Sequence, residues 1–220
     1  MTTLCFKGLL FDLDGTLIDS IPCVTRTWST WAESKGLDPD YVMSRIHGRP
    51  AIESIAELLD APVSSPEVQA EFDYLEQYEA THTDGTVALP GAIDLLKGLN
   101  ELGIPWAIVT SGTLPVATAR IKTTQLPQPK VLITPEVLKQ GKPHPEPYLR
   151  GAEALGLDAK DCICFEDASA GLESGIAAGC MTIAVLSHAS REQLPKADSY
   201  VNAPKDVVVR RVDGGFELDV

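Results

Sequence analysis

A short apolar segment that ends on two aspartates limits the possible fold of this chain more than any other stretch. Residues 4–11 are apolar at all but two positions, and Asp12, Asp14 and Gly15 follow. The segment is too short for a typical helix and predicts one buried strand. Because alternate residues of an extended chain point to the same side, we expect Asp12 and Asp14 to face one space. That space lies at the carboxyl end of a strand, where open α/β sheets bind ligands.

Two neighbouring carboxylates allow several kinds of chemistry. They can bind a hard divalent cation, or one can act as a nucleophile while the other exchanges a proton. Aspartates are also ordinary turn residues, and that interpretation stays open for this stretch taken alone. An EF-hand loop is excluded, because its fifth and twelfth positions fall on Thr16 and Cys23.

The pattern of hydrophobic residues divides the chain into two kinds of segment. Residues from about 20 to 83 show helical spacing without a good strand, whereas apolar strands and helices alternate from Thr86 onward. Alternation of this kind predicts a doubly wound parallel sheet. We therefore expect an α/β core domain, residues 1–18 and 85–220, and a small helical domain, residues 19–84, inserted after the first strand. The tail, 207–220, alternates about a glycine-rich turn and predicts a hairpin.

Two further segments carry polar side chains that could bind a ligand, one with hydroxyl groups and one with a lysine. Thr110 and Ser111 follow the expected strand 104–109, where a hydroxyl and backbone amides near a helix start suit a phosphate oxygen. Helix N-caps account for most hydroxyl residues in such places. Lys142 lies in a Gly-Lys-Pro-x-Pro loop whose prolines restrict the backbone, although a solvated lysine is the commoner case.

An acidic pair ends another apolar strand. Glu166 and Asp167 follow Cys162-Ile163-Cys164-Phe165. Together with Asp12 and Asp14 they are expected to put four carboxylates near one point. Like charges this close repel one another, and a bound divalent cation would offset that repulsion. Oxygen ligands and phosphate chemistry favour Mg²⁺.

In this order, Asp12 with Asp14, Thr110, Lys142, and Glu166 with Asp167 resemble the four motifs of the haloacid dehalogenase (HAD) superfamily of phosphotransferases. The resemblance covers essentially the whole chain and implies a Rossmann-like core with a helical cap. It implies an Mg²⁺-dependent phosphatase that forms an aspartyl-phosphate on Asp12, with Asp14 as general acid and base. Thr110, Ser111 and Lys142 would then bind the phosphoryl group. The metal would be held by Asp12, the Asp14 carbonyl and Asp167, with Glu166 as a direct or water-mediated helper.

The cap carries the question of substrate. His47 and Arg49 flank a glycine between two expected helices, so they are candidates to reach the substrate, although an ordinary interhelical turn fits equally well. The chain most resembles bacterial sugar and hexitol phosphatases. A phosphosugar mutase of the β-phosphoglucomutase type is the alternative, but its cap histidine and lysine fall on Val24 and His47. A non-catalytic protein that binds phosphorylated metabolites is a third hypothesis.

Composition excludes several partners. A formal net charge of -13 argues against nucleic acid and anionic membranes, and no apolar run is long enough to span a bilayer. The five cysteines form no C-x-x-C pair, so we expect reduced, mostly buried thiols in a cytoplasmic protein. We also expect a monomer that acts on a small-molecule phosphorylated substrate.

Overall fold

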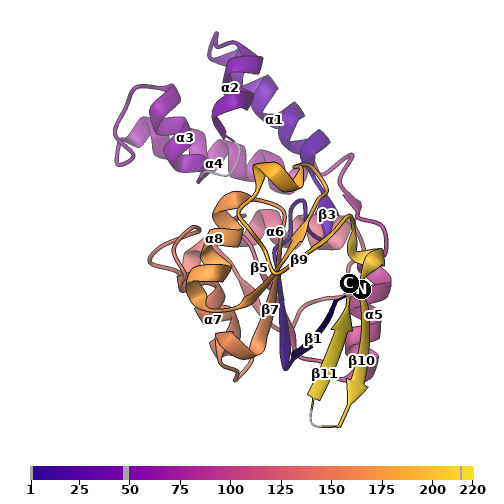
Figure 1. The fold of residues 1–220 in the computed structure, drawn as a ribbon. Coiled ribbons are helices and arrows are strands. Elements are labelled where there is room, and N and C mark those ends of the chain that lie inside the picture. The colour runs from indigo at the N-terminus through magenta and orange to yellow at the C-terminus, as the bar shows by residue number, and fades with distance from the viewer. Residues whose placement is uncertain (1, 47–49, 214) are drawn as a thin grey trace.

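A central parallel sheet organises the protein (Figure 1). The computed structural model describes residues 2–46, 50–213 and 215–220. Six strands lie in the order β6-β5-β2-β7-β8-β9, and every neighbouring pair is parallel. Their bounds are β2 (Gly8–Phe11), β5 (Trp106–Val109), β6 (Leu132–Ile133), β7 (Cys162–Glu166), β8 (Met181–Val185) and β9 (Ser199–Val201). The predicted α/β fold with a doubly wound parallel sheet is confirmed.

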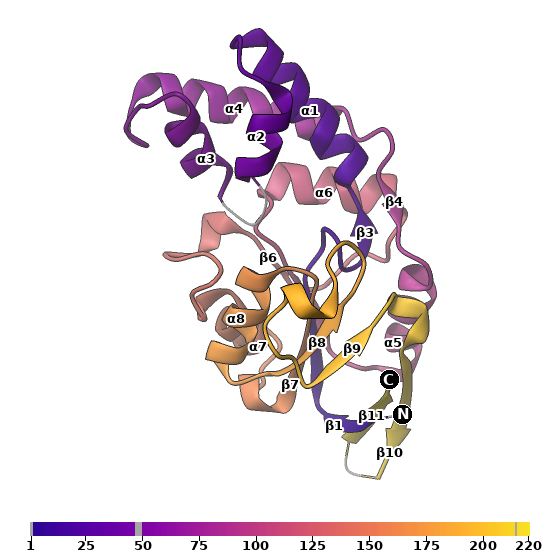
Figure 2. The same ribbon diagram turned by 45° about the horizontal axis from the view of Figure 1, so that its top comes forward.

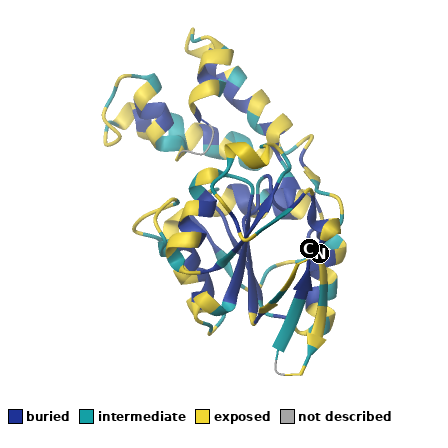
Figure 3. Ribbon diagram, viewed as in Figure 1, coloured by how far each residue is buried: buried dark blue, intermediate teal, exposed yellow. Residues whose placement is uncertain are grey.

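Every residue of the inner strands β2, β5 and β7 is buried, as the dark blue strands of Figure 3 show, so both faces of this sheet are covered. Leu9 and Phe11 pack on one side, where α5 (Ala92–Leu102) and α6 (Leu114–Thr123) contribute to the core. Leu10 packs on the other, against α7 (Glu146–Ala154), and α8 (Ser169–Ala178) covers the sheet nearby. A strand that is covered on both faces carries apolar residues continuously, and this explains why these strands were visible in the sequence.

The first apolar segment forms two strands, so the prediction of one strand over residues 4–11 is wrong. The strand β1 (Thr3–Phe6) joins an antiparallel sheet with β11 (Gly215–Asp219) and β10 (Val208–Val212), which form the predicted hairpin. The break falls at Lys7, whose amide donates to the Asp161 carbonyl. A side chain at Gly8 would overlap Leu157, so the chain passes here with no room to spare. Tertiary packing therefore ends one strand and starts the next.

Four helices form a separate layer beyond one end of the sheet (Figures 1 and 2). They are α1 (Ile21–Ser34), α2 (Pro39–Ile46), α3 (Ala51–Leu58) and α4 (Pro66–Thr81), and we call them the helical cap. The cap has its own apolar core around Trp28, Trp31, Ile55 and Leu75. The chain leaves the sheet through β3 (Ile18–Asp19) and returns beside it through β4 (Val87–Ala88). Domain boundaries at residues 18/19 and 84/85 stay a prediction.

Five cysteines are unpaired, and all but Cys5 are buried, in agreement with the predicted reduced thiols. Burial raises the pKa of the Cys162 thiol to about 11, so this sulfur stays protonated at neutral pH.

Within the part of the chain that the structure describes, no helix has the length and apolar character needed to cross a bilayer.

Candidate active site

The adjacent strands β2 and β7 bring three carboxylates together at their carboxyl ends. Asp12 follows β2, Glu166 ends β7 and Asp167 comes next, and their oxygens lie within 4.8 Å of one another. The two strands run parallel with Phe11 beside Phe165, and the Asp12 amide donates to the Phe165 carbonyl at 3.0 Å. The sheet register therefore fixes which acids meet.

Lys142 reaches the same place from the loop before α7. Its ammonium lies 2.7 Å from Asp12 Oδ1 and 2.6 Å from Glu166 Oε1, and it donates to the Val109 carbonyl at 2.8 Å. The Tyr148 hydroxyl donates to the same Glu166 oxygen at 2.5 Å. Only 7% of the Lys142 side chain is exposed, which excludes the solvated-lysine interpretation.

The site carries more negative charge than Lys142 can balance. Burial raises the pKa of Asp12 to about 7, and the charge of Glu166 adds to this shift while Lys142 opposes it. Burial also raises the pKa of Asp167 well above its usual range, with Asp12 and Glu166 as further causes. Closely spaced carboxylate oxygens with unrelieved repulsion are a donor set that fits a hard divalent cation.

Two glycines allow the backbone to pass close to these acids. A Cβ at Gly15 would overlap the carboxylate of Asp167, and the residue adopts φ 84°, where L-residues are disfavoured. A Cβ at Gly171, in the first turn of α8, would overlap the carboxylate of Glu166. Both glycines were visible in the sequence beside the acidic motifs, but their role appears only in the packing.

Asp14 lies apart from the three clustered carboxylates, so the expectation of four acids at one point is corrected to three. Its carboxylate forms an ion pair with Arg120 of α6, 2.9 Å from Nη1. Strand β2 has already ended at Phe11, and the chain turns at Gly15. Strand alternation therefore no longer controls where Asp14 points. Its charge still raises the pKa of Asp12, in a smaller part than burial and Glu166 do.

Thr110 and Ser111 lie at the end of β5, next to β2 in the sheet. Thr110 is buried, and its Oγ1 accepts the Gly112 amide at 3.0 Å. A Cβ at Gly112 would lie 3.8 Å from Asp14 Oδ2, so this loop runs beside Asp14. The loop after β5 and the turn after β2 therefore lie side by side.

Ser111 and Gly112 also line a cavity of about 160 Å³ between the helical cap and the sheet, which we call the cap cavity. The cap contributes mainly apolar side chains and two acids to it: Trp28, Pro50, Ala51, Ile52, Phe72, Leu75, Glu76 and Glu79. His47 and Arg49 lie outside the described residues, but Pro50, directly after Arg49, lines the cavity.

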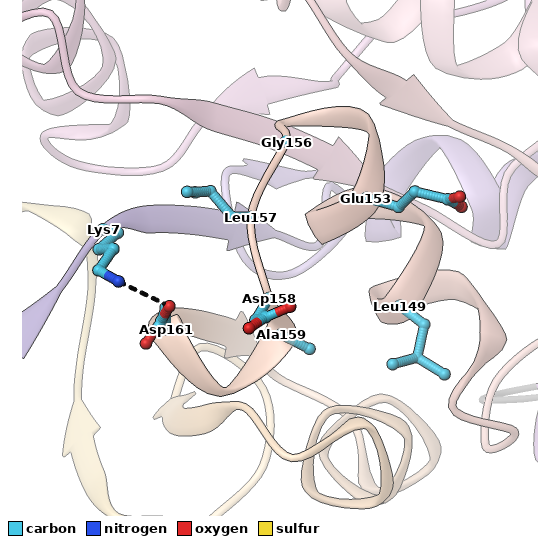
Figure 4. Close-up of a pocket in the computed structure, with 8 residues that line it drawn as sticks. All are labelled: Lys7, Leu149, Glu153, Gly156, Leu157, Asp158, Ala159 and Asp161. Carbon is cyan, nitrogen blue, oxygen red and sulfur yellow. Dashed lines mark hydrogen bonds and ion pairs between the residues drawn. The ribbon is translucent and has the colours of Figure 1, made fainter.

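A larger hollow, of about 570 Å³, has none of the candidate site residues in its lining, which Figure 4 shows. It is lined by residues that include Lys7 and Asp161, which form an ion pair at 2.9 Å, and Leu157. Lys7 precedes β2 and Asp161 precedes β7, whereas the carboxylate cluster follows the same two strands. The hollow therefore lies at the amino ends of the parallel strands and is not part of the candidate active site.

Three residues near the site were missed in the sequence. Arg120 falls on the apolar stripe of α6, with Val116 and Ala117, and a charged residue in such a stripe is a signal that was available. Glu79 similarly continues the spacing of Leu75 on α4. Tyr148 gave no signal, because its role depends on where α7 packs.

Comparison with known proteins places the chain in a family. The family model for haloacid dehalogenase-like hydrolases matches residues 6–179. Hexitol phosphatase A of Escherichia coli (strain K12) is 50% identical over 209 residues, which is 95% of this chain and 96% of that protein. Glycerol-1-phosphate phosphohydrolase 2 of Saccharomyces cerevisiae (strain ATCC 204508 / S288c) is 35% identical, covering 81% and 74%. The solved β-phosphoglucomutase of Clostridium difficile has a TM-score of 0.74 at 22% identity, covering 90% and 92%, and shows a shared fold. The chain belongs to the haloacid dehalogenase-like hydrolase family.

Proposed function

We propose that this protein is a phosphatase of small phosphorylated metabolites, with hexitol phosphates as its preferred substrates. The observation that carries the reaction class is the position of Lys142, which joins Asp12 and Glu166 at the carboxyl edge of the sheet. A buried carboxylate held by an ammonium is suited to attack phosphorus while the same cation balances the charge of the phosphoryl oxygens. Near-complete alignment with a hexitol phosphatase at 50% identity supports the substrate class.

Asp12 is proposed as the nucleophile that forms the aspartyl-phosphate. Two hydrogen bonds restrict the movement of Asp12: Lys142 donates one to its carboxylate, and its own backbone N–H donates the other to the Phe165 carbonyl of β7. The carboxylate is therefore already oriented before substrate arrives. Thr110, Ser111 and the adjacent backbone amides would hold phosphoryl oxygens at the end of β5.

Asp14 is proposed to protonate the departing alcohol and then to accept a proton from the attacking water. Only Leu13 lies between it and Asp12 in the chain, and its carboxylate lies near Gly112, a residue that lines the cap cavity. A leaving alcohol that extends into this cavity would therefore depart past Asp14. A carboxyl group in that position would be within reach of the leaving oxygen, as general acid catalysis requires.

The three clustered carboxylates fit Mg²⁺, for which Asp12, Asp167 and the Asp14 carbonyl are the proposed ligands, with Glu166 assisting. When bound, Mg²⁺ would balance charge on the phosphoryl group. Lys142 would continue to neutralise Asp12 and Glu166, and Tyr148 would hold Glu166 through its hydroxyl.

The mutase alternative has less support. Val24, where the mutase cap histidine is expected, packs against the apolar core of the helical cap. An aliphatic side chain there has no proton to exchange. The similarity to a solved β-phosphoglucomutase, at 22% identity, supports a shared fold and does not support a shared reaction.

A substrate panel tests the proposal. Purified protein with Mg²⁺ would be assayed for phosphate release from hexitol phosphates, glycerol phosphate, 2-deoxyglucose 6-phosphate and phosphoglycolate. We expect the highest kcat/KM for a hexitol phosphate. Isomerisation of a sugar phosphate that depends on a 1,6-bisphosphate would support the mutase instead. Binding without release from any ester would support the non-catalytic protein.

A further inference from the structure

Arg120 connects the helical cap to Asp14 through two ion pairs. It lies on α6, beneath the cap, and only 4% of the residue is exposed. Its Nη1 is 2.9 Å from Asp14 Oδ1, and its Nη2 donates to Glu79 Oε2 at 2.7 Å. Glu79 belongs to the cap helix α4, which packs on α6. Figure 2 shows α6 between the cap and the sheet.

The arrangement requires an arginine in particular. A planar guanidinium can place a separate terminal nitrogen beside each of two carboxylates, here as a hydrogen bond to Glu79 and an ion pair with Asp14, whereas an ammonium is a single point of charge. The Arg120 side chain is 5% exposed and that of Glu79 is 15% exposed, so solvent can replace little of this contact. Loss of the arginine would leave two partly buried carboxylates without their common cation.

Glu79 also lines the cap cavity, together with Trp28, Leu75, Ser111 and Gly112. A substrate in this cavity would therefore touch the same carboxylate that holds Arg120. Because Arg120 in turn contacts Asp14, two consecutive ion pairs connect the cap cavity to Asp14, the proposed general acid and base.

We propose that Arg120 is a positioning residue that orients Asp14 and couples its orientation to the cap through Glu79. The inference rests on the proposed function, since Asp14 matters only if the protein transfers phosphoryl groups. When the cap packs on α6 and Glu79 contacts Arg120, the Asp14 carboxylate is then held in the orientation needed to protonate the leaving alcohol and to accept a proton from the attacking water. Arg120 itself would not touch the phosphoryl group.

The competing interpretation is a purely structural clamp between cap and sheet, and a double-mutant cycle separates the two. The variants are Arg120→Lys, Asp14→Asn and the double variant, each measured for kcat and KM on a hexitol phosphate. Arg150→Lys is the matched control, because Arg150 forms an exposed ion pair with Glu153 on α7. Thermal unfolding of each variant checks the fold.

We expect Arg120→Lys to lower kcat by roughly tenfold or more with KM changed less than about threefold. The double variant should be no slower than Asp14→Asn alone, because a residue that acts through Asp14 has nothing left to orient. The single-turnover burst of nitrophenol from p-nitrophenyl phosphate should change little in Arg120→Lys, since this leaving group needs no proton. Arg150→Lys should match the wild type in every assay.

Glu79→Gln supplies a second route if Arg120→Lys fails to fold. It keeps the shape of the side chain, and its effect on kcat should likewise vanish in the Asp14→Asn background. Losses that multiply in the double variants, or a loss confined to KM, would overturn the inference and leave a clamp. An inactive wild type on every ester would instead overturn the proposed function, so the two failures are distinguishable.

Discussion

The Lys142 ammonium lies 2.7 Å from Oδ1 of Asp12, although 130 positions separate the two residues in the chain. The same ammonium also contacts Glu166, and so it joins the ends of β2 and β7. This buried cation offsets part of the negative charge that three neighbouring acids bring to the site. Its removal therefore tests both the chemistry and the electrostatic balance of the site.

Lys142→Met is expected to abolish phosphate release and to destabilise the metal-free protein. Removing one partner of a buried ion pair costs about 3–5 kcal/mol, because the remaining charges lose their compensation. Denaturant unfolding without metal would measure the stability change, and Lys139→Met, in the same loop region, is the control. Equal stability of Lys142→Met and wild type would contradict the proposed balance.

Asp12→Asn and Asp14→Asn should fail in different ways. An amide at position 12 is no nucleophile, so no phosphoryl transfer should occur with any substrate. Asp14→Asn should still form the phosphoenzyme slowly from aryl phosphates, whose leaving groups need little protonation. Rapid-quench measurement of phosphoenzyme distinguishes the two variants. Near-normal turnover by Asp12→Asn would show that the nucleophile is misassigned.

Removal of metal should abolish activity and make stability depend on pH. The folded-state pKa of Asp12, about 7, exceeds its usual 3.8, and that of Asp167 is also raised. Between about pH 4 and about pH 7 the folded protein therefore binds more protons than the unfolded chain does. Its free energy of unfolding falls as the pH rises from about 4 to about 7. Added Mg²⁺ should oppose that fall and bind more tightly toward pH 7.

Melting curves with EDTA or Mg²⁺ across this pH range would check the prediction, alongside phosphate release. EDTA should stop turnover, Mg²⁺ should restore it, and Ca²⁺ should support it poorly because it accepts looser geometry. A Tm in EDTA that stays constant or rises from pH 5 to 7 would contradict the electrostatic argument. Full activity in metal-free protein would contradict the metal assignment.

Gly171→Ala should reduce both stability and activity. Its new methyl group would overlap the Glu166 carboxylate and push this acid away from Lys142. Gly98→Ala is the matched control, because Gly98 also lies within a helix and a Cβ at this position would meet no other atom within 4 Å. Gly98→Ala should be neutral or stabilise the protein by up to about 1 kcal/mol. Thermal unfolding and kcat measured on both variants decide the matter.

His47→Ala and Arg49→Ala should lower kcat/KM for hexitol phosphates by roughly tenfold or more, equivalent to about 1.4 kcal/mol. Their side chains are proposed to recognise substrate hydroxyls, so a small aryl phosphate should be hydrolysed almost normally. Arg45→Ala is the control, since Arg45 pairs with Glu57 on the outside of the cap. Equal losses on both substrate types would indicate a role in cap closure or folding.

Hydrophobic patterning along the chain was enough to predict the parallel sheet and the strand ends on which much of the candidate site lies, whereas the family resemblance was needed to single out Lys142. Strands that are buried on both faces must be apolar throughout, so β2, β5 and β7 were visible, and the polar residues at their ends stood out. Parallel strands end at one edge, and this alone brings Asp12, Thr110 and Glu166 toward each other. The short edge strand β9 was not predicted, because its three residues, Ser199–Val201, carry little hydrophobic pattern.

The direction of the Asp14 side chain and the cation beside it depend instead on tertiary packing. Beyond Phe11 the chain turns, so local alternation no longer fixes the side chain, and Arg120 is supplied by a helix that follows about a hundred residues later. The split of the first apolar segment at Lys7 likewise depends on β11, at the far end of the chain. Local sequence patterns report which faces are buried, whereas the pairing of charges depends on which distant elements cover those faces.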